Sequence, residues 1–155
     1  MRGKQAPKRK IKADPKFSRT DVAKLINKIM QGGKKTIAQG IVYDAFEYIS
    51  EKAKKDPVDV YDTAIRNISP NLEVKGKRIG GANYQVPIVV TGERKLTLAH
   101  RWLLAAARSK KGMAMSKKLG DELMSAANGE GEAMKKREDV QRMAEANKAF
   151  AHFRW

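Results

Sequence analysis

The stretch NLEVKGKRIGGANYQVPIVV, residues 71–90, decides how the rest of the chain folds. Its apolar residues recur at every second position, whereas those on both sides of it recur at every third or fourth. The first spacing is typical of β-strands and the second of helices. Between the two expected strands, 72–79 and 84–90, residues 80–83 supply two glycines, an alanine and an asparagine, a composition that tolerates positive φ. The sequence therefore predicts a two-stranded hairpin with a four-residue connection, inserted into a helical protein.

The first strand of this hairpin is cationic, with Lys75, Lys77 and Arg78 around Gly76. A lone two-stranded ribbon is at best marginally stable in water, so this one requires helices at its base and a partner along its length. A positively charged ribbon that needs a partner indicates an anionic polymer. The pattern alone also fits a small sheet that covers a core and turns its lysines to solvent.

The composition excludes several classes of protein. A chain of 155 residues can form one domain with a real core. Because it has no cysteine, it has no disulfide, no cysteine-ligated zinc and no thiol nucleophile. It also has no apolar run that could span a bilayer or act as a secretory signal, so we expect a cytoplasmic, unprocessed protein without a membrane partner.

Positive charge is concentrated in two places. The net charge is +16 and the pI about 10.1. Residues 1–16 hold seven Lys and Arg against one acid, and residues 91–118 hold eight against one. The rest of the chain mixes both signs. Such clustering is typical of a surface that binds nucleic acid.

The chain divides into an arm and a domain. Residues 1–16 have little apolar content and two prolines, so we expect a disordered basic arm that orders on its partner. Residues 17–155 form the helical domain, with the hairpin at 71–90. The fold class is mainly α, a single domain of six helices with the hairpin protruding between the third and fourth. The first helix is expected to run from a Ser18 cap, with Asp21 completing the capping box, to Gly32, and the second covers 36–54. The third runs from an Asp56 cap, with Pro57 in its first turn, to Ser69, and the fourth covers 93–108. The fifth runs from a Ser116 cap to Ala127, and the sixth begins at about Lys135.

Gly33, Lys34, Lys35 and Thr36 superficially resemble a nucleotide-binding loop. The motif requires a glycine where Lys28 stands and a preceding strand, so we reject it. Two lysines at a glycine turn and at a helix N-terminus still favour phosphate, although a solvated turn is the plain alternative.

The helix expected over 93–108 adds a cationic side, continued by Lys110 and Lys111, next to the hairpin. His100 within it has no second histidine or spaced carboxylate, so we expect a core or surface residue rather than a ligand. At the C-terminus, three aromatic residues, a histidine and an arginine could stack on bases, or could equally pin the chain end to the core.

Four strings carry a resemblance to a known family: GGKK at 32–35, VKGKRIGGANYQVP at 74–87, LAHRWL at 98–103 and KKREDVQRMAEANKAFAHFRW at 135–155. Together they resemble bacterial-type small-subunit ribosomal protein seven. The resemblance implies six helices with a ribbon between the third and fourth. It also implies primary binding to the 3′ major domain of small-subunit ribosomal RNA, assembly of the subunit head, neighbouring ribosomal proteins as partners, and a place near exit-site transfer RNA and the messenger exit path.

The resemblance assigns residues to these contacts. Those expected to bind ribosomal RNA are Lys34, Lys35, Lys75, Lys77, Arg78, Asn83, Arg94, Arg101 and Arg108, and charge alone adds Lys8, Arg9, Lys10, Lys12, Lys110 and Lys111. Those expected near transfer or messenger RNA are Gly80, Gly81, Ala82, Tyr84, His152, Arg154 and Trp155.

Two other classes compete with this interpretation. A general architectural protein that binds DNA or RNA also uses ribbons and basic arms, but on DNA it would be expected to wedge an apolar side chain into the duplex, and the Gly-Gly-Ala-Asn tip has none. A nuclease needs a carboxylate cluster or a histidine pair, and the acids here are capping residues or dispersed. We therefore expect no enzymatic activity, no metal, no cofactor and no small-molecule substrate.

Overall fold

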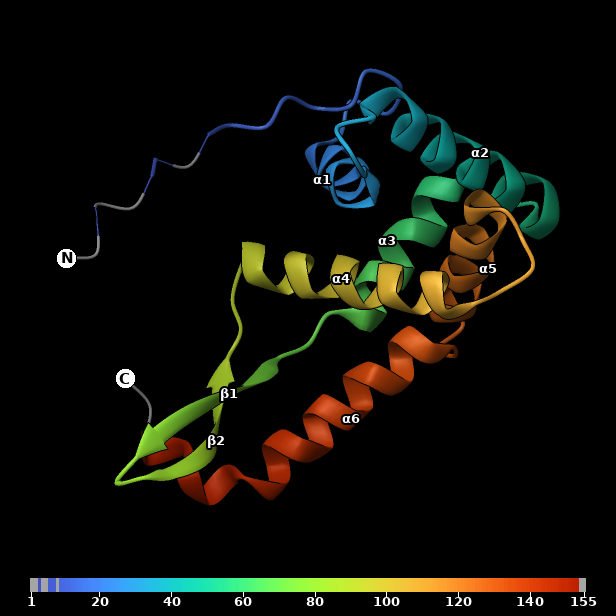
Figure 1. Cartoon of the computed structure of the whole chain (residues 1–155). Helices are drawn as coiled ribbons and strands as arrows, with labels where there is room; N and C mark the ends of the chain where they lie inside the picture. Colours follow the sequence, from blue (N-terminus) through green and yellow to red (C-terminus); the bar gives the residue numbers. More distant parts are fainter. Residues whose placement is uncertain (1–2, 4–5, 8, 154–155) are drawn as a thin grey trace.

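The computed structural model describes residues 3, 6–7 and 9–153. It confirms the mainly helical fold with a hairpin between the third and fourth helices (Figure 1). In chain order the elements are α1 (Thr20–Ile29), α2 (Lys35–Ala53), α3 (Pro57–Ile68), β1 (Leu72–Ile79), β2 (Ala82–Val89), α4 (Glu93–Ser109), α5 (Met115–Ala127), α6 (Glu132–Ala146) and the 3-10 helix η1 (Lys148–Phe153).

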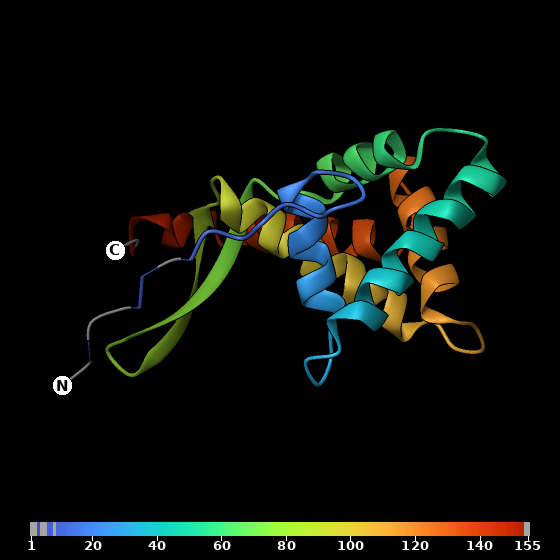
Figure 2. The same cartoon turned by 90° about the horizontal axis from the view of Figure 1, so that it is seen from above.

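The core lies among α1 to α5, and α5 packs against α2, α3 and α4. Large side chains from each of these helices are fully buried, among them Leu25, Phe46, Tyr61, Leu103 and Leu119. Each contributes about 1.5–3 kcal/mol of transfer free energy, so the bundle is held by burial rather than by helix propensity. Seen from above, α2, α3 and α5 lie at one end of the molecule and the hairpin projects at the other, with η1 beside it (Figure 2). No helix among the described residues is both long and apolar enough to cross a lipid bilayer.

The C-terminal segment packs on the hairpin. Helix α6 runs from the bundle toward the strands, and η1 lies beside them (Figure 1). The Tyr84 ring of β2 contacts the rings of Phe150 and Phe153, at centroid distances of 5.1 and 5.3 Å. Lys77 Nζ donates a hydrogen bond to the carbonyl oxygen of Phe153 at 3.0 Å. The chain end is therefore pinned, but to the ribbon rather than to the helical core.

The hairpin turn is tighter than the sequence predicts. The two strands are antiparallel, and Ile79 pairs with Ala82, so only Gly80 and Gly81 connect them. Both glycines have positive φ, +54° and +90°, which a two-residue hairpin turn demands and which other residues adopt only under strain. The predicted four-residue connection is wrong, because Ala82 and Asn83 extend the second strand.

Two predicted helix caps are wrong and one is confirmed. The cap position of α1 is Arg19, and Ser18 stands outside the helix with φ +53°. Helix α5 begins at Met115, so Ser116 lies inside it. The Asp56 carboxylate accepts the Val58 N–H at 2.8 Å, as predicted. The side chain of Arg19, which stands at the cap position of α1, accepts no helix N–H group, and its guanidinium instead donates to carboxylates on α1 and α3.

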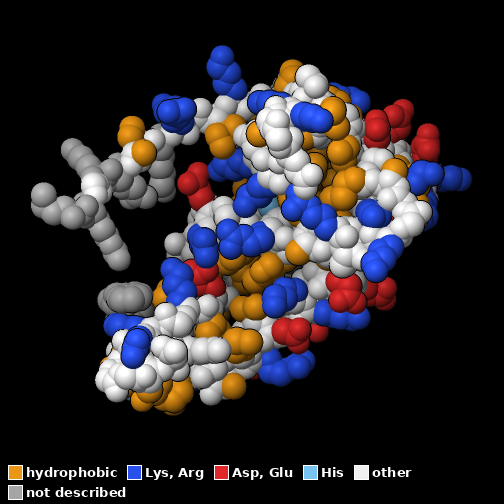
Figure 3. Space-filling view, in the orientation of Figure 1, with side chains coloured by type: hydrophobic (Ala, Val, Ile, Leu, Met, Phe, Trp, Pro, Cys, Tyr) orange, Lys and Arg blue, Asp and Glu red, His pale blue; other side chains and the backbone are white. Residues whose placement is uncertain are grey.

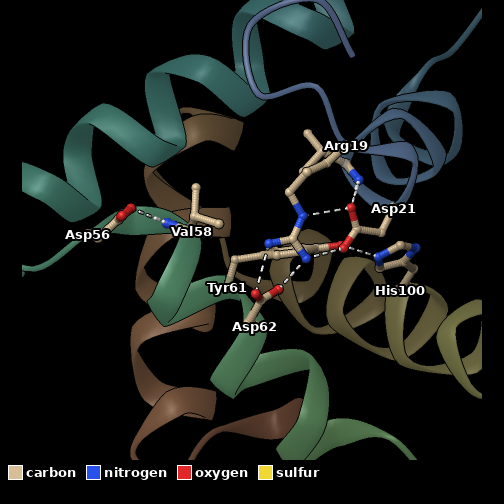
Figure 4. A network of polar contacts seen from close by, with 8 residues as sticks. Arg19, Asp21, Asp56, Val58, Tyr61, Asp62 and His100 are labelled. Carbon is tan, nitrogen blue, oxygen red and sulfur yellow. Dashed lines mark hydrogen bonds and ion pairs between the residues drawn. The ribbon is translucent and has the colours of Figure 1, made fainter. Parts of the chain in front are cut away.

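That arginine joins α1 to α3 (Figure 4). Arg19 donates to Asp21, two residues further on in α1, and to both carboxylate oxygens of Asp62 on α3, at 2.8 and 2.6 Å. Burial pushes the pKa of Asp21 up, but the hydrogen bonds from Arg19 and Val22 outweigh it and the pKa lies below its usual value. The acids near the N-terminus of α1 are therefore structural.

The folded part begins inside the expected arm. Asp14 is 3% exposed, and its carboxylate accepts the N–H groups of Lys16 and Phe17 and the hydroxyl of Tyr43. Residues 14–16 thus belong to the domain. Arg9, Lys10 and Lys12 are exposed and lie in neither helix nor strand. Lys8 falls outside the described residues.

Candidate nucleic-acid interface

A group of cations gathers where α4 passes the end of α1. Lys28, Arg101 and Arg108 line a hollow of about 280 Å³ together with Leu104 and Ala105. Figure 3 shows Lys and Arg side chains crowded over α4. We call Lys28, Lys34, Arg101 and Arg108 the cationic face, since Lys34 borders the groove beside Arg108.

Helix geometry explains why α4 presents a cationic side. Arg94, Arg101 and Arg108 are spaced by seven residues, almost two full turns, so they lie along one side of the helix. Leu103 and Ala107, on another side, are fully buried in the core. Anchoring the apolar side of α4 therefore fixes the arginine side toward solvent, where Arg101 and Arg108 are exposed.

The charges of the cationic face repel one another. The pKa of Lys28 is lowered, first by burial and then by the positive charges of Arg101 and Arg94. Lys28 Nζ donates to the Thr97 carbonyl oxygen at 3.2 Å, and this hydrogen bond holds the lysine beside the two arginines. Sequence analysis missed Lys28, because its place beside Arg101 depends on how α1 crosses α4. A polyanion would relieve this repulsion, so the surface is suited to phosphate.

Two of the predicted RNA-binding cations are braced by an acid. Arg94 donates to Glu73 Oε2 at 2.8 Å, and Lys75 lies 3.2 Å from Glu73 Oε1. Burial pushes the pKa of Glu73 up, but the hydrogen bonds from Arg94 and Lys75 outweigh it, and the net pKa is lowered. Glu73 thereby ties the base of the hairpin to the first turn of α4, next to the cationic face.

The outer half of the hairpin carries the remaining ribbon residues. Arg78 pairs across the strands with Asn83, and both are exposed beside the turn. Gly80, Gly81 and Ala82 are exposed as well. Lys77 and Tyr84, paired across the strands, are half-buried by contact with η1. The structure therefore leaves Arg78 and Asn83 at the surface and draws Lys77 and Tyr84 into the junction with the C-terminus.

The other predicted site residues are distributed as follows. Lys34 and Lys35 are exposed at the start of α2. Lys111 is exposed after α4, whereas Lys110 Nζ lies 2.7 Å from Oε2 of the buried Glu122. His152 is exposed, with Nδ1 at 2.8 Å from the Ala149 carbonyl oxygen. Arg154 and Trp155 fall outside the described residues.

His100 is a core residue. Its ring is fully buried, and its Nε2 lies 2.8 Å from the hydroxyl of Tyr61 (Figure 4). Burial, reinforced by the charge of Lys28, lowers the pKa of His100 to about 4. The ring is therefore uncharged at neutral pH and serves as a hydrogen-bonding partner inside the bundle. Throughout the described ranges, no three His, Asp or Glu side chains form a cluster that could hold a metal ion.

Comparison with known proteins gives consistent similarities. The family model described as ribosomal protein S7p/S5e matches residues 1–148. The chain is 57% identical to the small ribosomal subunit protein uS7 of Thermosipho africanus over 155 residues, which covers all of both chains. The proteins of the same name from Moorella thermoacetica and an Azoarcus species are 56% and 53% identical, over 97% and 99% of each chain.

Proposed function

The chain belongs to the ribosomal protein S7p/S5e family, and from this premise we propose that it is a structural protein of the small ribosomal subunit that binds ribosomal RNA. The RNA target would be the 3′ major domain, where binding would begin assembly of the subunit head. Neighbouring small-subunit proteins would be further partners, and the protein would reside in the cytoplasm as part of the ribosome. The proposal requires no catalysis, metal or cofactor.

The observation that carries the proposal is the cluster of cations on the cationic face, with further cations along the ribbon. Arg94 and Lys75, both paired with Glu73, lie at the base of the hairpin, and Arg78 is exposed nearer the tip. Lys10 and Lys12 of the arm add positive charge at the other end of the chain. Such a surface can neutralise phosphates from several RNA helices at once and hold together strands that repel one another.

The hairpin limits how RNA can bind. The deep, narrow major groove of A-form RNA excludes side chains, so a ribbon lies along a minor groove or at a junction of helices. Arg78 and Asn83 would then contact backbone and 2′-hydroxyl groups, which reads shape more than sequence. The exposed tip at Gly80, Gly81 and Ala82 lets another RNA backbone approach closely, which supports a place for it near exit-site transfer RNA or messenger RNA.

The C-terminal segment is proposed to contribute in two ways. His152 is exposed and could contact transfer or messenger RNA directly. Tyr84, Phe150 and Phe153 instead contact one another: Phe150 and Phe153 are nearly parallel at an interplanar angle of 12°, and the Tyr84 ring is tilted against both. This cluster would hold the ribbon in one orientation, so that fewer conformations are lost when RNA binds.

Replacing Arg78 with alanine is expected to weaken binding to the 3′ major domain RNA by about tenfold, because one phosphate contact near the hairpin tip is lost. Thermal unfolding followed by circular dichroism should stay unchanged, since the side chain is exposed. The matched control is Arg142→Ala on α6, where the arginine side chain is 78% exposed. Equal loss of affinity in both variants would show that the hairpin has no special role.

A further inference from the structure

An open groove of about 580 Å³ lies between the end of α1, the start of α2 and the first residue of α5. Much of its lining is apolar and comes from all three helices, with Met30, Ile37, Ile41 and Met115 among the residues. Its volume lies within the range of roughly 300–1,000 Å³ that is usual for sites that hold a small, flat molecule. Nothing in the cationic face described above uses this apolar lining.

Ile37 is the unexplained residue of the groove. This isoleucine is 58% exposed, whereas its neighbour Ala38 packs into the core. Single exposed apolar side chains are common on protein surfaces. Here, however, Ile37 shares one hollow with the half-buried Met30 and Met115, so apolar surface is left open in a concave place.

The edge of the same groove is positively charged. Lys34 and Arg108 line it, and among the described residues no acidic side chain does. Arg108 also lines the neighbouring hollow with Lys28 and Arg101, so the groove opens directly onto the cationic face. A partner for this groove must therefore combine a flat apolar group with negative charge on either side of it.

We propose that the groove binds one unstacked base of the bound RNA, with the adjoining phosphates on Lys34 and Arg108. The inference rests on the proposed RNA-binding function and specifies a site within it. Proteins recognise single-stranded or bulged RNA by bases that leave the stack and lie against side chains. Methionine suits this role, because its flexible, polarisable side chain adapts to a ring of either size. The absence of acids from the lining favours RNA over a protein segment with basic residues at its edge.

The test is the variant Ile37→Ser, bound to the 3′ major domain RNA over a series of salt concentrations. Affinity should fall about tenfold, because apolar contact is lost. The slope of log affinity against log salt should stay unchanged, because no phosphate contact is lost. Ile37→Leu should bind as the unchanged protein does. Met143→Ser is the control, since Met143 is 42% exposed on α6 and does not line the groove.

A second measurement reads the base itself. Chemical probing of unpaired bases in the RNA should show one base protected by the unchanged protein and by Met143→Ser, but reactive again with Ile37→Ser. If Ile37→Ser binds as tightly as Met143→Ser and leaves every base protection in place, the inference is wrong and the groove belongs to a protein partner or to none. Failure of the proposed function looks different: the unchanged protein would then show no preference for this RNA over a shuffled one, and the inference would fall with it.

Discussion

Replacing Lys28, Arg101 and Arg108 together with alanine is expected to weaken binding to the 3′ major domain RNA by about 100-fold at moderate salt. The three side chains line one hollow on α1 and α4, so they address neighbouring phosphates. Removing three phosphate contacts should also make the slope of log affinity against log salt shallower by about two to three. Titrations of labelled RNA at several salt concentrations measure both effects.

The fold should survive this triple substitution. Arg101 and Arg108 are exposed, and the pKa of Lys28 is lowered, first by burial and then by the positive charges of Arg101 and Arg94. The matched control is Lys55→Ala, Arg66→Ala and Arg142→Ala, which removes the same formal charge from exposed positions elsewhere on the surface. If the control lowers affinity and slope as much as the triple substitution does, net charge explains binding and the cationic face has no defined role.

Replacing Glu122 with alanine is expected to lower the free energy of unfolding by about 3 kcal/mol, a large part of the usual 5–15 kcal/mol. The Glu122 side chain is 1% exposed, and its Oε2 lies 2.7 Å from Lys110 Nζ. Its Oε1 accepts the N–H of Ala133 at 3.0 Å, in the first turn of α6. The substitution therefore leaves a cation without its partner and a buried N–H without an acceptor. Urea unfolding followed by circular dichroism measures the loss.

Urea unfolding of a Lys110→Ala variant, together with its RNA binding, decides the role of Lys110, which the sequence predicts to bind RNA. If the ion pair is structural, Lys110→Ala should destabilise the fold and leave the salt dependence of RNA binding unchanged. Lys111→Ala, one residue on and exposed, is the comparison. A Lys110→Ala protein with normal stability and a shallower salt slope would restore Lys110 to the RNA-binding surface and contradict the structural assignment.

Periodicity in the sequence was sufficient for the architecture. The alternation over 71–90 predicts the hairpin, and the spacing on both sides predicts the helices, because burial of one face dictates each pattern. The Asp56 cap could also be predicted, because an aspartate directly before a proline is typical of a helix start, with the proline in the first turn. The seven-residue spacing of Arg94, Arg101 and Arg108 would have predicted their common side as well.

What the sequence left undetermined depends on contacts between helices. Ser18 looks like a cap, but it lies outside α1, and Arg19 at the cap position binds carboxylates on α1 and α3. Lys110 and Lys28 are both lysines near helix ends, yet one meets a buried carboxylate and the other meets an arginine. Local pattern cannot distinguish these outcomes, because the deciding partner lies far away along the chain.

The prediction of the hairpin turn failed for a related reason. It rested on the composition of a few residues, whereas strand register is set by packing along whole strands. The ring contacts of Phe150 and Phe153 with Tyr84 likewise join segments far apart in sequence.

The most direct test of the account is affinity against salt for three targets of equal length: the 3′ major domain of small-subunit ribosomal RNA, a shuffled RNA and duplex DNA. The account predicts tight binding to the first, which persists at salt concentrations that release the other two. If all three affinities fall together along one steep salt line, the protein is a general nucleic-acid binder that acts by charge alone, and the proposed recognition of ribosomal RNA is contradicted.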